Sequence, residues 1–263
     1  MNLGIKDRVA VVAASSRGLG QAVARGLAKE GAKLALCART APDLNTAAEE
    51  IRRDTGAEVM THALDVTDYA EVRRFIAAVI ERFGRLDICV ANAGGPPAKS
   101  FAETTMEDWR AAADLNLMST VYFGKEALPV MQRQHWGRFI AITSVAVKQP
   151  VDGLILSNSV RSGVSGLIKT LANEYGRHGV LVNNVCPGYT ATARLVELSH
   201  RLAEKEGVDP AEIEERWARQ TALGRVGRPE EFADLVVFLA SERATYITGT
   251  SIAVDGGLVK GLY

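Results

Sequence analysis

A turn of small residues between two apolar runs is the first feature of this sequence that could do chemistry. Val9 to Ala14 is apolar, the turn Ser15-Ser16-Arg17-Gly18-Leu19-Gly20 follows, and a helical pattern leads to a second apolar run at Leu34 to Ala38. Strand, glycine turn, helix and strand make a right-handed βαβ unit. Backbone N–H groups of such a turn, with the start of the next helix, bind a pyrophosphate. We therefore expect residues 15–20 to form a dinucleotide site.

The end of the second apolar run indicates which nucleotide is bound. An NAD site has an acidic residue there for the ribose 2′-OH, but the sequence reads Cys37-Ala38-Arg39-Thr40 and has no acid until Asp43. Arg17 and Arg39 could flank a 2′-phosphate through bidentate contacts. The alternative is a pair of solvated surface arginines. We predict that NADP(H) is preferred over NAD(H).

Polar residues and glycines also follow four other apolar runs. They are Asp65 and Val66 after residues 57–64, Asn92, Ala93 and Gly94 after residues 86–90, Ser144 after residues 139–143, and Pro187, Gly188 and Thr190 after residues 180–186. Ligands of parallel sheets lie at the carboxyl ends of the strands. These positions should therefore converge with Gly18 on one crevice.

Alternation of strands and helices defines the fold class. Helical patterns cover residues 42–55, 69–83, 105–134, 157–177 and 229–240, and a last strand is expected at Ser251–Val254. Most of the strands are apolar on both faces, which is typical of a parallel sheet covered by helices on both sides. We predict an α/β fold of the Rossmann type, doubly wound on seven parallel strands. No linker divides residues 1–263, so one domain is expected.

Composition excludes several classes of function. The 263 residues carry no net charge and no basic tract, so nucleic acid is not an expected partner. Three cysteines lie in apolar runs and indicate reduced core thiols, and the four histidines show no spacing for a metal. The N-terminus lacks a signal-peptide pattern, and no apolar run reaches membrane-spanning length. We expect a cytoplasmic protein with no metal and no membrane contact.

These motifs together resemble the classical short-chain dehydrogenase/reductase family, especially its beta-ketoacyl-carrier-protein reductase-like branch. The family's TGxxxGxG is represented by residues 13–20, its NNAG by residues 91–94, its active-site Asn by Asn116 in LNLMST, and its Ser by Ser144 in ITSVA. Residues 187–188, 224–230 and 247–257 also match family signatures.

The resemblance implies a function and partners. It implies an NAD(P)-dependent oxidoreductase that acts on a carbonyl or alcohol such as a 3-oxoacyl thioester, and a homotetramer or dimer. It also implies that Asp65 accepts from the adenine amino group, with capping of the next helix beside Asp68 as the alternative. Asn92 would pack near the cofactor. Asn116 is a poor former of helix interiors, so we expect a local kink or a buried water site there.

Two departures from the family pattern affect the expected chemistry. Ala14 replaces the first glycine of the cofactor loop, and a methyl group there is tolerated easily only if φ is negative. Ser157 and Arg161 replace the Tyr and Lys of YxxxK. A Ser hydroxyl is a much weaker acid than a phenol, whereas Arg161 can still donate hydrogen bonds to the cofactor ribose. Cofactor binding should therefore survive while proton transfer is weakened.

Three readings of this cleft stay open. The first is an NADP(H)-dependent oxidoreductase in which Ser144, Asn116, Ser157 and Arg161 line the reaction centre. The second is a catalytically silent nucleotide-binding sensor or scaffold protein. The third is proton chemistry such as dehydration or isomerisation. Tyr189 is the nearest surrogate acid by loop position, with Ser159 and Lys148 weaker, although a lid or wall role for Tyr189 is favoured.

A polar helical segment at residues 190–223 is the expected substrate lid. Ile213 and Trp217 lie one helical turn apart in it. They could cover an apolar ligand or dock the lid helix.

Overall fold

The computed structural model describes residues 2–262, which form a single seven-stranded parallel sheet. The strands are β1 (Val9–Ala13), β2 (Lys33–Ala38), β3 (Val59–Ala63), β4 (Ile88–Ala91), β5 (Gly137–Ile142), β6 (Val180–Pro187) and β7 (Ser251–Val254). Their order in the sheet is β3-β2-β1-β4-β5-β6-β7. Strand β1 pairs with β2 on one side and with β4 on the other, so the order in which strands are added to the sheet reverses between β1 and β4. This is the switch point where doubly wound sheets bind nucleotides. The predicted fold class is confirmed.

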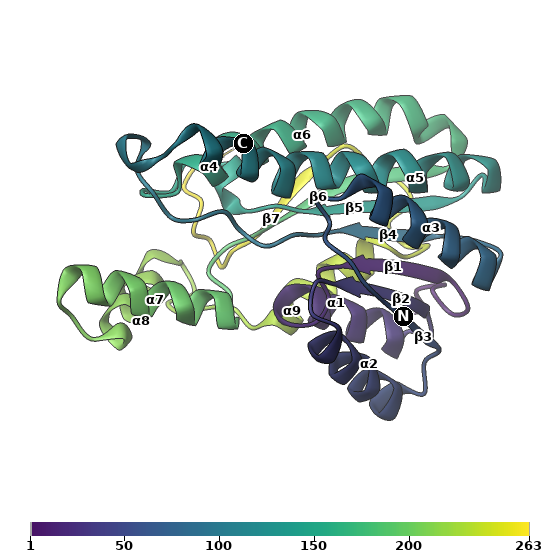
Figure 1. The fold of residues 1–263 in the computed structure, drawn as a ribbon, viewed down its shortest axis with the longest axis horizontal. Helices are drawn as coiled ribbons and strands as arrows, with labels where there is room; N and C mark the ends of the chain where they lie inside the picture. Colours follow the sequence, from purple (N-terminus) through teal and green to yellow (C-terminus); the bar gives the residue numbers. More distant parts are fainter. Residues whose placement is uncertain (1, 263) are drawn as a thin grey trace.

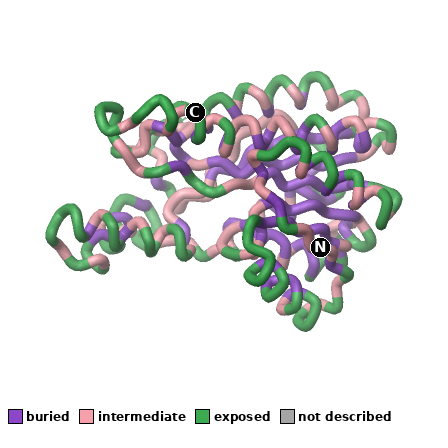
Figure 2. Tube along the Cα trace, in the orientation of Figure 1, coloured by how far each residue is buried: buried purple, intermediate pink, exposed green. Residues whose placement is uncertain are grey.

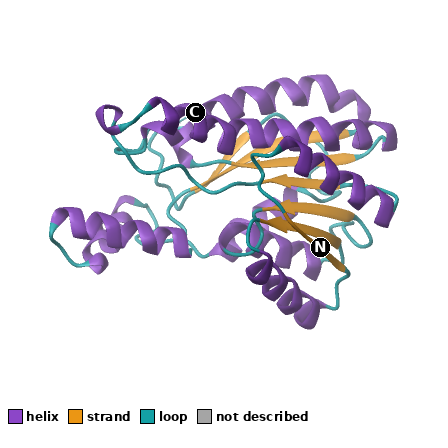
Figure 3. Ribbon diagram, in the orientation of Figure 1, coloured by secondary structure: helices purple, strands orange, loops and turns teal. Residues whose placement is uncertain are grey.

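Helices cover both faces of the sheet (Figures 1 and 3). They are α1 (Gly18–Lys29), α2 (Ala41–Thr55), α3 (Tyr69–Phe83), α4 (Met106–Ala113), α5 (Ser119–Gln134), α6 (Ile155–Tyr175), α7 (Ala193–Glu206), α8 (Pro210–Gln220) and α9 (Pro229–Leu239). Apolar side chains of α1, α2 and α9 form one core with the sheet, and those of α3, α5 and α6 form the other. Figure 2 shows the inner strands buried between these layers, whereas the edge strands β3 and β7 are partly exposed. Within residues 2–262, no helix has the length and apolarity needed to span a membrane.

Local sequence signals fix several helix ends. Asp68 accepts a hydrogen bond from the Glu71 N–H and caps α3, as predicted. Thr105 and Asp108 form a reciprocal capping box at the start of α4. Pro229 is the first residue of α9, a position where its missing N–H costs no hydrogen bond.

The predicted helix over residues 105–134 is present from Met106 to Gln134, but one π-helical turn interrupts its α-helical hydrogen bonding. Residues Asp114–Met118 form a π-helical turn that separates α4 from α5. The turn is centred on Asn116, whose side chain donates to the Gly94 carbonyl. The expected local kink is therefore confirmed, and it places Asn116 at the carboxyl end of β4.

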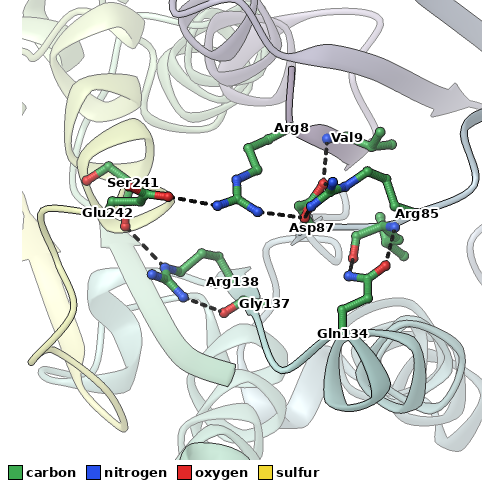
Figure 4. A network of polar contacts seen from close by, with 10 residues as sticks. Arg8, Val9, Arg85, Asp87, Gln134, Gly137, Arg138, Ser241 and Glu242 are labelled. Atoms are coloured by element: carbon green, nitrogen blue, oxygen red, sulfur yellow. Dashed lines mark hydrogen bonds and ion pairs between the residues drawn. The ribbon is translucent and has the colours of Figure 1, made fainter. Parts of the chain in front are cut away.

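At the opposite end of the sheet, a network of charges holds the strands together (Figure 4). The fully buried Asp87 carboxylate accepts from the Val9 N–H and from the guanidinium groups of Arg8 and Arg85. Arg8 also contacts Glu242, which follows α9. Because all of these residues lie at the amino ends of the strands, this network serves the architecture and leaves the carboxyl ends for function.

Candidate active site

The carbonyl oxygen of Gly94 is the meeting point of the candidate catalytic residues. Asn116 Nδ2 donates to it at 2.8 Å, and Arg161 Nη2 donates to it at 3.1 Å. Gly94 follows β4, Asn116 lies in the π-helical turn and Arg161 lies in α6. Three segments far apart in sequence are thus joined at one acceptor. The Asn116 Oδ1 atom is buried there with no hydrogen-bond partner among residues 2–262.

Arg161 also joins the loop after β4 to the end of β5. Its Nη1 donates to the carbonyl oxygens of Ile142 and Thr143, at 3.2 and 3.0 Å. The side chain is only 6% exposed. Burial, with a smaller contribution from the charge of Arg194, lowers the pKa of Arg161 to about 10, so its guanidinium stays charged at neutral pH. Arg161 is a charged clamp on backbone carbonyls.

Two serine hydroxyls lie in the same region. Ser144 follows β5, and its Oγ accepts from the Ala146 N–H at 3.1 Å, which leaves the hydroxyl proton for another acceptor. Ser157 lies one turn before Arg161 on α6, which packs against residues 145–147. Ser157 is 6% exposed, and its hydroxyl makes no hydrogen bond within residues 2–262. Both hydroxyls can therefore donate to a polar ligand atom.

The turn between β1 and α1 holds an unusual backbone conformation. Ala14 has φ +48°, a left-handed value that favours glycine, so the replacement of the family glycine introduces strain. Asn92 Nδ2 donates to the carbonyl oxygens of Ala13 and Ala14, at 3.2 and 3.4 Å, and braces this turn. A Cβ atom on Gly20 would lie 2.4 Å from the Ala14 oxygen. Glycine at position 20 is therefore required by packing.

The residues around this turn fit a nicotinamide dinucleotide. The first turn of α1 contains no acidic residue, so its N–H groups face no competing carboxylate. Arg17 follows β1 and Arg39 follows β2, and both are exposed, while Ser16, Gly18 and Leu19 are partly exposed. A Cβ atom on Gly94 would meet nothing within 4 Å, so the backbone there is open to a ligand. Ser15 is different, because its buried hydroxyl and its N–H both donate to the Cys37 carbonyl.

The remaining predicted cofactor residues form the flanks of the crevice. Asp65 accepts from the N–H and the hydroxyl of Thr67, at 2.9 and 2.8 Å, and Asp68 alone caps α3. Val66 is buried, and Ala93 and Pro187 are partly exposed. Gly188 and Thr190 are tied together, since the Thr190 hydroxyl donates to the Gly188 carbonyl. The structure thus brings the predicted loops to one edge of the sheet.

The segment predicted to be a substrate lid forms a helical hairpin, α7 and α8, with its own small core. Ile213 and Trp217 of α8 are buried against α7, in a cluster with Tyr189 and Ala203. The Tyr189 ring stacks on Trp217, with centroids 5.2 Å apart, and its hydroxyl donates to Gln220. Burial raises the pKa of Tyr189. Ile213 and Trp217 therefore pack α8 on α7, and the Tyr189 side chain belongs to this packing through Trp217 and Gln220.

Sequence reasoning missed the residues that connect the lid to the crevice. Arg194 of α7 donates to the Pro96 carbonyl at 3.0 Å, and Glu197 lies 3.7 Å from Arg17. Lys205 lies 3.7 Å from Glu103, on the loop after β4. These contacts connect α7 to the turn after β1 and to the loop after β4. The only sequence signal was the presence of single charges in a segment already identified as a lid.

The histidine, cysteine and carboxylate side chains of residues 2–262 form no metal-binding cluster, and the thiols are buried. No group of three or more His, Cys, Asp or Glu side chains in residues 2–262 could hold a metal ion. Cys37, Cys89 and Cys186 are all buried, as predicted. Burial raises the pKa of Cys37 to about 12, so this thiol stays protonated and unreactive at neutral pH.

Comparisons with known proteins agree with this geometry. A family model described as enoyl-(acyl carrier protein) reductase matches residues 13–259. A 3-oxoacyl-(acyl-carrier-protein) reductase of Aquifex aeolicus is 31% identical over 98% of this chain and 100% of its own length. The structure of L-sorbose reductase from Gluconobacter frateurii, complexed with NADPH and L-sorbose, superposes with a TM-score of 0.95 at 33% identity and covers 100% of both chains. An actinorhodin polyketide ketoreductase with NADPH has a TM-score of 0.93 at 32% identity, over 97% of this chain and 98% of that one.

Proposed function

This chain belongs to the classical short-chain dehydrogenase/reductase family, and we propose that it is an NADP(H)-dependent oxidoreductase that reduces a carbonyl group or oxidises an alcohol. Its substrate would be 3-oxoacyl-thioester-like or another small ketone, and its proton delivery is weakened. The observation that carries this proposal is the shared Gly94 acceptor, which keeps Asn116, Arg161 and the ends of β4 and β5 in one rigid arrangement.

NADP(H) is proposed as the cofactor because two arginines follow the strands β1 and β2. Arg17 and Arg39 are exposed there, and the sequence offers no acid for a ribose 2′-OH before Asp43. The L-sorbose reductase and the actinorhodin ketoreductase were both solved with NADPH. When bound, the nicotinamide would supply the hydride, while residues 15–20, Asn92 and residues 187–190 would hold the nucleotide.

Each residue of the cleft then has a limited task. Ser144 donates its hydroxyl proton in a hydrogen bond to the substrate carbonyl and polarises it. Arg161 supplies positive charge and holds the backbone, and Ser157 offers a second hydroxyl. Neither replaces a phenol activated by an ammonium, and a positioned acid of that kind is worth roughly 10²–10⁴ in rate. We therefore expect slow turnover.

A catalytically silent nucleotide sensor is the second candidate. One observation favours it: the Arg161 guanidinium donates to three backbone carbonyls. Those N–H bonds point into the protein and not towards a ribose, so Arg161 serves the structure first.

Cofactor titration followed by turnover separates the two candidates. NADPH fluorescence is titrated with the full chain, and NADPH oxidation is then followed on ketones, 3-oxoacyl thioesters and quinones. Tight NADPH binding with slow, saturable turnover supports the oxidoreductase. Tight binding without turnover on any member of the panel supports the sensor. Comparable affinities for NADPH and NADH would refute the cofactor preference.

A further inference from the structure

Arg194 of the lid reaches across the crevice to the loop after β4. Its Nη2 donates to the Pro96 carbonyl at 3.0 Å. A Cβ atom on Gly95 would lie 3.6 and 3.8 Å from Arg194 Nη2 and Nε, so the guanidinium packs on the Gly95 backbone. Gly94, the next residue, has open space where its Cβ would be. The guanidinium therefore lies beside the open backbone where a substrate can enter.

Two further cations belong to this region. Arg161 donates to the Gly94 carbonyl, and the charge of Arg194 lowers its pKa further. Lys148 follows residues 145–147, and its charge acts with that of Arg161 on the thiol of Cys186 at the end of β6. None of the three makes an ion pair within 4.0 Å in the part of the chain that the structure describes.

The carboxylates near this region do not neutralise the lid arginine. Asp255 accepts from the N–H groups of Gly257 and Val259, in the turn after β7. Asp152 is exposed, and its charge acts on Tyr189. Residues 93–98 between Arg161 and Arg194 contain no acid. Helix α7 does carry carboxylates, but Glu197 lies 3.7 Å from Arg17, Glu206 pairs with Arg216, and no carboxylate within residues 2–262 lies within 4.0 Å of an Arg194 nitrogen.

We propose that the substrate of this cleft carries an oxyanion, a carboxylate or a phosphate, which Arg194 holds while the reacting carbonyl lies at Ser144. A guanidinium suits this task because its planar N–H groups match an oxyanion in pairs. Pro96 takes one bond from Nη2, and no other hydrogen bond of Arg194 is found within residues 2–262. The inference rests on the proposed function, since it names the substrate class of the same cleft.

Matched pairs of charged and neutral compounds test the proposal. The ligands are oxo acids against their methyl esters, and dihydroxyacetone phosphate against dihydroxyacetone. Binding is measured by calorimetry on the cofactor-free protein and on its NADP⁺ complex, and turnover with NADPH is measured separately. The variants are Arg194→Gln and, as the matched control, Arg201→Gln, which removes an exposed charge from the same helix.

The proposal expects an anionic compound to bind more tightly than its neutral partner by about 10- to 100-fold, the range of a hydrogen bond to a charged group. Arg194→Gln should remove that preference, and Arg201→Gln should keep it. The preference for carboxylate or for phosphate identifies the source of the oxyanion.

Three results would overturn it. The first is equal binding of an acid and its ester by the wild type. The second is an unchanged preference for the anion in Arg194→Gln. The third is a loss of NADPH affinity in Arg194→Gln as large as the loss of anion affinity, because this would assign Arg194 to the cofactor phosphates. Because binding is measured without turnover, a protein that binds oxo acids through Arg194 but never oxidises NADPH supports this inference and contradicts the oxidoreductase proposal.

Discussion

Asn116 and Arg161 donate hydrogen bonds to the same acceptor, the carbonyl oxygen of Gly94, at 2.8 and 3.1 Å. One side chain comes from a π-helical turn and the other from the middle of α6. The shared acceptor fixes the loop after β4 relative to the end of β5. The cleft is therefore held in shape by a buried arginine of α6.

Removing this clamp should weaken the fold. In Arg161→Met, the carbonyl oxygens of Gly94, Ile142 and Thr143 lose a buried donor, so we expect the free energy of unfolding to fall by about 1–3 kcal/mol. Urea unfolding followed by circular dichroism measures the change. Arg177→Met removes an exposed arginine and should change stability little. Equal stability of Arg161→Met and the wild type would show that the clamp contributes nothing.

The nucleotide turn offers a pair of opposite substitutions. Gly20→Ala would place a methyl group 2.4 Å from the Ala14 oxygen, so it should abolish tight NADPH binding and lower the melting temperature. Ala14→Gly removes the left-handed strain at φ +48°. That strain costs roughly 1–2 kcal/mol, and the added chain entropy of glycine offsets roughly 0.5–1 kcal/mol of the gain.

Gly166 provides the control for the added methyl group. It lies in α6, and a Cβ atom there would meet nothing within 4 Å. Gly166→Ala should therefore keep stability and NADPH affinity. A Gly20→Ala protein that bound NADPH normally would mean that the turn adopts another conformation.

Cofactor preference should depend on two exposed arginines. Arg17→Ala and Arg39→Ala should each weaken NADPH binding by about tenfold or more, since a hydrogen bond to a charged group is worth roughly 1.5–3 kcal/mol. NADH affinity should stay nearly constant, because NADH lacks the 2′-phosphate. Fluorescence titration measures both, with Arg53→Ala as an exposed control. Parallel losses for NADPH and NADH would place these arginines elsewhere on the cofactor.

The pH dependence of turnover should be flat where a phenol would normally titrate. Burial raises the pKa of Tyr189, so its hydroxyl stays neutral, and the lowered pKa of Arg161, about 10, still leaves its guanidinium charged. Neither group changes protonation between about pH 6 and pH 9. We expect kcat/KM for ketone reduction to vary little over that range. A steep loss as pH rises through neutrality would reveal a general acid that the structure does not identify.

The fold could be predicted from the sequence because its signals are local and repeated. The apolar runs form the strands, and Asp68, the Thr105–Asp108 pair and Pro229 each mark the start of one helix. The crevice could be predicted because parallel strands bring their carboxyl ends to one edge.

Side-chain directions could not be predicted in the same way. The pattern at Arg161 allows contacts to a ribose, but burial in α6 turns the guanidinium onto backbone carbonyls. Ile213 and Trp217 have the spacing of a helix face, which does not say whether that face meets a ligand or α7. The bond from Arg194 to Pro96 depends on where the α7–α8 hairpin lies relative to the loop after β4, which no local pattern encodes.

The most direct test of the central claim is the rate of NADPH oxidation with a ketone in Ser157→Tyr combined with Arg161→Lys. The account holds that the nucleotide pocket is intact and that proton delivery limits the wild type. It predicts a rise of roughly 10²–10⁴ in the double variant, with the affinity for NADPH unchanged, and a smaller rise in Ser157→Tyr alone. A double variant that binds NADPH normally and is no faster than the wild type would contradict the account.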